Sequence, residues 1–146
     1  MPLMDIFDVA GSAMAAQNLR LNTTASNLAN AESVSSNRDE TYRARHPVFA
    51  ARLAEATFSA EPQAAATEQA AAGVMVAGIV ESDAPLQLKY EPHHPMADEA
   101  GYVAYPNVNV VEEMANMMSA SRSFQMNVQM LSTVKSMAER LLTMGQ

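Results

Sequence analysis

The feature that most constrains this chain is a long C-terminal stretch that repeats like a helix and contains no helix breaker. Its apolar and small side chains recur in alternating steps of four and three residues at Val110, Met114, Met117, Ser121, Phe124, Val128 and Leu131, and Val134, Ala138 and Leu141 or Leu142 continue the pattern with a small phase shift. This spacing is typical of a helix that pairs with another helix through a narrow stripe. Because this stretch contains neither Pro nor Gly until Gly145, we predict one helix of about 33 residues, roughly 50 Å long. A helix longer than its own small domain implies a partner that covers the stripe.

The N-terminal part predicts a second long helix, from about residue 5 to residue 30. Four apolar side chains recur there every seven residues, which indicates a coiled-coil stripe rather than the broad face of a core helix. We therefore expect the two terminal helices to pair as a coiled coil. The predicted helix-pairing seam consists of Phe7, Met14, Leu21, Leu28, Met114, Met117, Phe124, Val128 and Leu131.

Methionine is abundant, with 12 residues in 146, and seven of them fall within the predicted C-terminal helix. Ordinary core packing accounts for Met114 and Met117, which lie on the stripe. Met118, Met126 and Met130 point away from it, and a helix that is apolar on several faces is buried by several neighbours. Methionine also adapts to packing environments that differ slightly. We therefore predict that these three residues make contacts between subunits.

The middle of the chain has a different texture. Residues 57–73 are rich in Ala, Glu, Gln and Thr, which predicts a mobile linker or a short solvated helix. Residues 73–80 and 86–90 read as short strands, with a turn at 83–85, and so predict a hairpin. Residues 101–105 add a third strand. Pro92 and Pro95 predict an extended path for residues 90–95.

These elements predict a mainly α fold with a small β element. Residues 1–31 and 107–146 are the two terminal helices, which together form one domain. Residues 32–106 are a middle segment, with a loop and linker over 32–73 and the β element over 74–105. Asn109 followed by Glu112 predicts the N-terminal cap of the second helix.

Charge and composition exclude several classes of function. The net charge of −7 disfavours a nucleic acid or an anionic membrane as a partner, because both require a clustered basic face. The absence of cysteine excludes disulfides, thiolate zinc sites and cysteine nucleophiles. Residues 1–8 contain no basic residue, so we expect no cleaved secretory signal. No run approaches the ~20 apolar residues of a membrane span, and we expect no membrane insertion.

The sequence predicts no catalytic, cofactor or metal site. His93 and His94 are adjacent, and neighbouring residues on an extended chain point to opposite sides, so they would not converge on one ion. The chain has neither a nucleophile elbow nor a glycine-rich phosphate loop. Glu112 and Glu113 lie where acids compensate a helix dipole. We therefore expect a protein that is not an enzyme.

Four stretches resemble a known family. LNTTASNLANA (residues 21–31) and NVNVVEEMANMMSASRSFQMNV (107–128) resemble the terminal helices of the bacterial flagellar axial proteins, the rod–hook family. MDIFDVAGSAMAAQNLRLN (4–22) and HPMADEAGYVAYPNVNVVEEM (94–114) are similar to its proximal-rod member. The TPGY-like turn that follows the first helix in many relatives is absent, and AESVSSNRDETYRAR (31–45) stands there instead.

The resemblance implies a structural subunit of the proximal rod of the flagellar basal body, which transmits torque from the membrane ring to the hook. It implies an inner helical tube built from the terminal helices of many subunits. The implied partners are other rod proteins, the protein at the junction of membrane ring and rod, further copies of this chain and, in transit, the flagellar type III export apparatus. The implied location is the rod across the periplasm, reached without a cleaved signal peptide.

The alternative from another class is a soluble helical binding module, such as an export adaptor or chaperone. Such a protein would close its own core and stay folded as a monomer or dimer. The long separation of the two helices by a β-type segment argues against it.

Overall fold

The computed structural model describes residues 2–53 and 71–144. Its elements in chain order are α1 (Pro2–Ala29), β1 (Arg45–Leu53), β2 (Ala71–Glu81), β3 (Gln87–Tyr90), β4 (Tyr102–Tyr105) and α2 (Val110–Met144). The predicted fold class, mainly α with a small β element, is confirmed at this level. The two terminal helices agree with the prediction to within a few residues, the usual uncertainty of helix ends.

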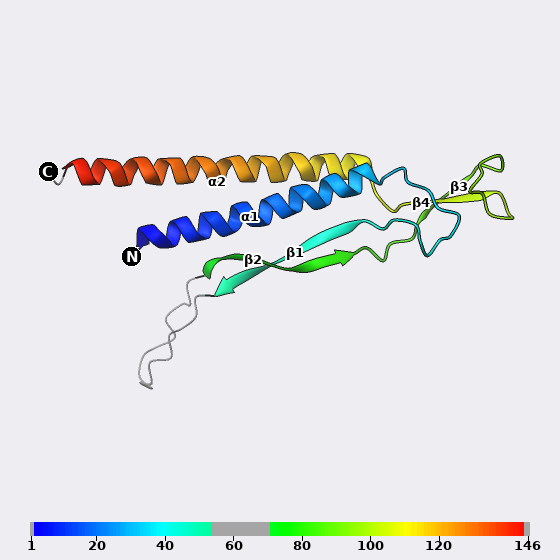
Figure 1. The fold of residues 1–146 in the computed structure, drawn as a ribbon, viewed down its shortest axis with the longest axis horizontal. Helices are drawn as coiled ribbons and strands as arrows, with labels where there is room; N and C mark the ends of the chain where they lie inside the picture. The colour runs from blue at the N-terminus through cyan, green and yellow to red at the C-terminus, as the bar shows by residue number, and fades with distance from the viewer. Residues whose placement is uncertain (1, 54–70, 145–146) are drawn as a thin grey trace, which may run out of the picture.

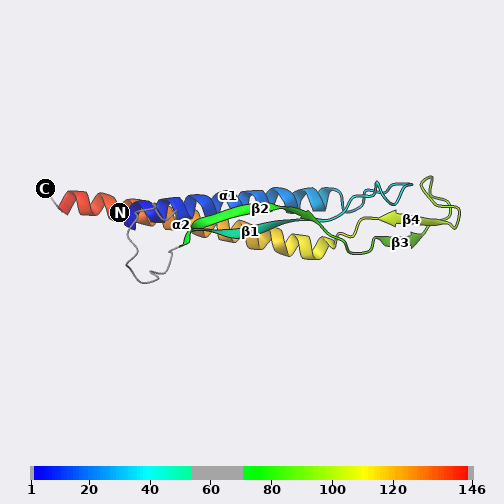
Figure 2. The ribbon, with the colours of Figure 1, turned by 90° about the horizontal axis from the view of Figure 1, so that it is seen from below.

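The molecule is elongated and built in layers (Figure 1). Antiparallel helices α1 and α2 pack side by side, and the β1–β2 sheet packs against α1. Figure 2 shows β1 and β2 running along α1, with β3 and β4 beyond the end of the helices. Helix α1 is therefore the middle layer, covered on one side by α2 and on the other by the sheet.

Local signals explain where α2 begins. The Asn109 side chain accepts a hydrogen bond from the Val111 backbone N–H at 3.1 Å, and its own carbonyl accepts one from the Glu113 N–H at 2.9 Å. Asparagine is a favoured N-cap for this reason, and acids in the first turn complement the helix dipole. The predicted cap at Asn109 is confirmed.

The predicted strand pairing was wrong. We expected residues 73–80 to pair with residues 86–90, but β2 pairs antiparallel with β1, from Arg45 opposite Glu81 to Leu53 opposite Ala71. Strand β1 lies in the segment predicted as loop and linker. Its sequence, RHPVFAARL, contains a proline, and its few large apolar residues are interrupted by small and polar ones. A two-stranded sheet tolerates that proline because both of its strands are edge strands.

Strand β3 pairs instead with β4, from Gln87 opposite Tyr105 to Tyr90 opposite Tyr102, so the predicted third strand exists. The predicted extended path of residues 90–95 was also wrong. Backbone hydrogen bonds from His94 N–H to Glu91 O and from Ala97 N–H to His94 O form consecutive turns. The predicted linker at 57–73 lies outside the described residues, except for Ala71–Gly73, which begin β2.

The core is small. Among the described residues, seven hydrophobic residues are buried and twenty large hydrophobic side chains are exposed. Five of the buried residues are alanines, namely Ala10, Ala16, Ala44, Ala104 and Ala120. Small side chains let packed elements approach closely but bury little apolar area. Neither described helix combines the length and apolarity needed to cross a bilayer.

Candidate functional site

The predicted seam residues of α1 are only partly covered. Phe7, Met14, Leu21 and Leu28 are all half-buried. The most buried positions of α1 are instead small or polar, because α1 packs on both α2 and the sheet. They are Ala10, Ala16, Thr23, Thr24 and Asn27.

On α2 the buried stripe is shifted by about one residue from part of the predicted seam. Met117, Phe124 and Leu131 are half-buried, whereas Met114 is 49% and Val128 45% exposed. The positions just before those two turn inward: Glu113 is buried and Asn127 half-buried. The spacing of apolar residues does not reveal the buried Glu113 or the half-buried Asn127. The predicted seam therefore contained their apolar neighbours instead. That Met114 and Val128 pair across the seam in an assembled state remains a prediction.

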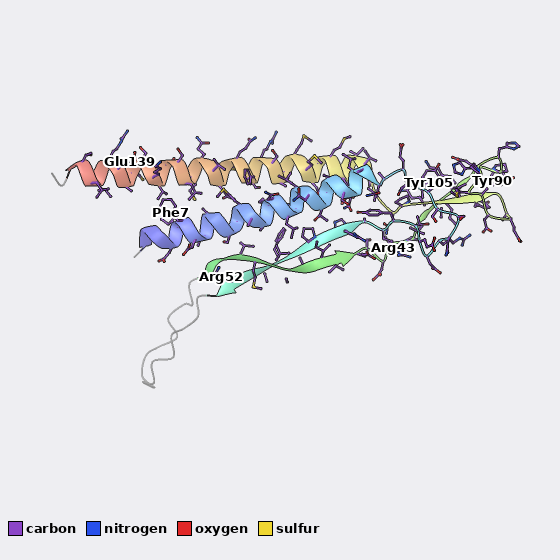
Figure 3. All side chains as sticks on the ribbon, in the orientation of Figure 1. Phe7, Arg43, Arg52, Tyr90, Tyr105 and Glu139 are labelled. Atoms are coloured by element: carbon purple, nitrogen blue, oxygen red, sulfur yellow. The ribbon has the colours of Figure 1, made fainter. Side chains whose placement is uncertain are left out.

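The exposed surface of α2 carries methionines among polar side chains such as Arg122, Gln125 and Gln129. Met118 is 60%, Met126 71% and Met130 54% exposed, and side chains project from α2 on the side away from α1 along its length (Figure 3). We call Met118, Met126 and Met130 the outer face of α2. Buried apolar area is the main favourable term in association, so contacts of these three side chains with neighbouring subunits remain a prediction.

The last turns of α2 are exposed for a different reason. Leu142 is 75% exposed, although it lies four residues after half-buried Ala138 and so continues the inward stripe. The C-terminal end of α2 extends past the N-terminus of α1 (Figure 1). The stripe therefore continues beyond the helix that covers it in this subunit.

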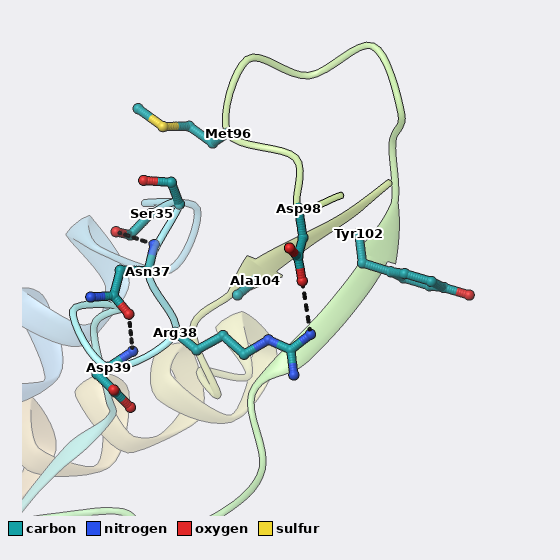
Figure 4. A pocket seen from close by; sticks show the side chains of 9 residues that line it. Ser35, Asn37, Arg38, Asp39, Met96, Asp98, Tyr102 and Ala104 are labelled. Atoms are coloured by element: carbon teal, nitrogen blue, oxygen red, sulfur yellow. Dashed lines mark hydrogen bonds and ion pairs between the residues drawn. The ribbon is translucent and has the colours of Figure 1, made fainter. Parts of the chain in front are cut away.

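A polar cleft lies at the opposite end, between the loop after α1 and the β3–β4 hairpin (Figure 4). Arg38 and Asp98 form an exposed ion pair across it at 3.4 Å. Asn37 Oδ1 accepts a hydrogen bond from the Asp39 N–H at 3.1 Å, and Ser35 bridges to Ala104. The Arg38–Asp98 ion pair and the Ser35–Ala104 bridge attach the loop to the hairpin, whereas the Asn37–Asp39 hydrogen bond lies within the loop. They place no nucleophile beside a base.

At the same end of the molecule, the phenol of Tyr105 has a shifted pKa. The Tyr105 hydroxyl donates to the Glu91 carboxylate at 3.4 Å, and the Lys89 ammonium lies 4.1 Å from the ring centroid. Burial, followed by the negative charge of Glu91, raises the pKa of Tyr105 above its ordinary value of 10.0. Among the described side chains, no three His, Cys, Asp or Glu residues are grouped to hold a metal ion.

Comparisons with known proteins match both ends of the chain. The family described as Flagella basal body rod protein matches residues 7–35. The family described as Flagellar basal body rod FlgEFG protein C-terminal matches residues 99–144. These ranges contain most of α1 and all of α2.

Whole relatives match over their full length. The flagellar basal-body rod protein FlgC of Salmonella typhimurium is 53% identical over 146 residues, covering all of both chains. FlgC of Yersinia enterocolitica is 47% identical with the same coverage. FlgC of Borreliella burgdorferi is 34% identical over 151 residues, covering 100% of this chain and 99% of the relative. The chain therefore belongs to the FlgC family of flagellar basal-body rod proteins, which are structural subunits of the rod.

Proposed function

We propose that the chain is a subunit of the proximal rod that is completed by its neighbours. The observation that carries this proposal is the imbalance between seven buried hydrophobic residues and twenty exposed large ones in the described part of the chain. A self-contained adaptor or chaperone would bury more of its apolar surface. In a rod, the outer face of α2 and the uncovered turns around Leu142 pack against neighbouring subunits.

Within one subunit, the two terminal helices act as a single paired unit. Their close packing and the half-burial of Met117, Phe124 and Leu131 support a coiled-coil pair. The Arg20 guanidinium also donates to Asn116 Oδ1 at 3.0 Å, which links the C-terminal part of α1 to the N-terminal part of α2. Many such pairs, arranged head to tail, form an open helical tube rather than a closed ring. Torque then passes through many parallel contacts.

The partners proposed for this surface are other rod proteins, the protein at the junction of membrane ring and rod, and further copies of this chain. The proposed location is the rod where it crosses the periplasm, and the proposed route is the flagellar type III export apparatus without a cleaved signal. The role is structural rather than catalytic.

The experiment replaces FlgC of Salmonella typhimurium with this chain and its variants. Phe124→Asp places a charge on the half-buried side of α2, and burying an unpaired charge opposes helix pairing. Asn22→Asp introduces the same residue at an exposed position of α1, away from the outer face of α2, and is the control.

We expect the parent chain and Asn22→Asp to be found in purified hook–basal bodies and to support swimming, and Phe124→Asp to do neither. Normal incorporation of Phe124→Asp would contradict the helix pairing. Absence of the parent chain from hook–basal bodies, together with a stable cytoplasmic pool, would instead favour an adaptor.

A further inference from the structure

Two asparagine side chains bind the backbone of adjacent residues at the start of strand β1. Asn27, from α1, is fully buried. Its Nδ2 donates to the Arg45 carbonyl at 2.8 Å and its Oδ1 accepts from the Arg45 N–H at 3.0 Å. The side-chain amide thus pairs with one backbone residue in the way that a neighbouring strand would. The Tyr42 hydroxyl donates to the same Oδ1 at 2.8 Å.

Asn107 also binds the backbone at the start of β1, from the segment that leads into α2. Its Oδ1 accepts from the Ala44 N–H at 2.8 Å. Its Nδ2 lies 3.2 Å from the Ser82 carbonyl and 2.9 Å from the Ala84 carbonyl, and donates to both. Asn107 therefore joins the start of β1 to the chain leaving β2, immediately before α2 begins.

Together these bonds use every backbone polar group of Ala44 and Arg45. The Ala44 carbonyl, the one group not bound by an asparagine, accepts from the Ser82 N–H at 2.8 Å. Buried backbone groups require such partners, and here the partners come from α1, from Ser82 just after β2 and from the segment before α2. No single element can complete the arrangement alone.

A second contact fixes the direction of the sheet. Far along α1 from Asn27, the Ser12 hydroxyl accepts from the Val74 N–H at 3.1 Å. Residues 12 and 27 are about 22 Å apart along a helix that rises 1.5 Å per residue. Two attachment points at that separation fix the orientation of the sheet, so that it runs along α1.

We propose that Asn27 and Asn107 form a joint that positions the β1–β2 sheet against both terminal segments. Each comes from one of the two sequence stretches, 21–31 and 107–128, that first indicated the family. The joint itself is a property of the chain. Its consequence for the rod, where it sets the sheet at a fixed angle to the helical tube, rests on the proposed function.

The test uses hydrogen–deuterium exchange on the purified full-length chain, resolved by peptide. Asn27→Asp and Asn107→Asp keep the size of each side chain but remove its donor, because an ionised carboxylate only accepts hydrogen bonds. The matched controls are Asn22→Asp, on the same helix at an exposed position, and Asn109→Asp, which still caps α2 because Asp and Asn are equivalent N-caps.

We expect exchange in residues 45–53 and 71–81 to accelerate about tenfold to hundredfold in both joint variants, since a buried group loses its partner. Exchange in residues 12–29 and 110–124 should stay within about threefold of the parent, and the controls should match the parent throughout. At lower pH, the ratio of the sheet's exchange rate in Asn27→Asp to its rate in the parent should fall, because a protonated carboxyl regains a donor for the Arg45 carbonyl.

Two results would overturn the joint. Unchanged exchange in the sheet would show that the asparagines do not hold it. Equal acceleration in both helices would show that they support the whole fold rather than the position of the sheet. Neither result affects the rod role, which is tested by incorporation of Phe124→Asp at a residue outside the joint.

Discussion

Removing the apolar outer face of α2 should block assembly while leaving the isolated subunit intact. The perturbation is the triple variant Met118→Ala, Met126→Ala and Met130→Ala. Full burial of a methionine side chain contributes about 1.5–3 kcal/mol, and these three are 54–71% exposed in the subunit. Each therefore has about 1–2 kcal/mol left to gain from a neighbour. Truncation to alanine removes roughly 1 kcal/mol at each site, or about 3 kcal/mol for the three together, which weakens subunit addition about a hundredfold or more.

The stability of the subunit itself should change little, because exposed substitutions usually stay within about 0.5 kcal/mol each and alanine is a strong helix former. The assay pairs a thermal melt of the purified chain with swimming motility and the yield of hook–basal bodies. Replacing the same three residues by leucine is the control, since exchange of Met for Leu conserves apolar volume.

We expect the alanine variant to melt like the parent and to fail in assembly, and the leucine variant to assemble. Normal rods with the alanine variant would refute the reasoning. So would an alanine variant whose loss of assembly is explained by a collapsed melting temperature.

Two further predictions concern the subunit alone. A Cβ added at Gly73 would overlap Ser12 Oγ at a φ of +135°, whereas one added at Gly11 meets nothing within 4 Å. Gly73→Ala should therefore lower the free energy of unfolding by about 2 kcal/mol, and Gly11→Ala should raise it by about 0.5–1 kcal/mol, as measured by denaturant titration; equal effects would contradict the close approach. The raised pKa of Tyr105 means that its stabilising contribution is present below pH 10 and is lost as the pH rises through the folded value. Glu91→Gln should lower the pKa of Tyr105 and reduce the loss of stability in melts at alkaline pH, and an identical loss would exclude the role of Glu91.

The helices were predictable because their signals are local. The stepwise spacing from Met117 through Leu131 and the cap at Asn109 require only neighbouring residues, and both helices lie where the sequence placed them. The strand order was not predictable in this way. The partner of β2 is separated from it by residues 54–70, and nothing near β1 specifies that partner.

The position of the buried stripe on α2 depends on polar burial, which spacing of apolar residues cannot detect. Glu113 is buried because it lies on the face turned toward the rest of the fold, and Met114 is exposed one residue later. Asn27 and Asn107 were overlooked for the same reason: an amide that completes the backbone hydrogen bonds of Ala44 and Arg45 has no hydrophobic signature. Their only sequence signal was membership of the two stretches that resemble the rod family.

The central claim is that neighbouring subunits cover the outer face of α2, and oxidation of its methionines tests this most directly. The purified dilute chain and purified hook–basal bodies would be exposed to the same dose of peroxide, and the sulfoxide formed at Met118, Met126 and Met130 measured by mass spectrometry. Susceptibility follows exposure, so we expect ready oxidation in the dilute chain and at least about tenfold slower oxidation in the assembled rod. Equal rates in the two states would show that the outer face stays open to solvent, and would contradict the account.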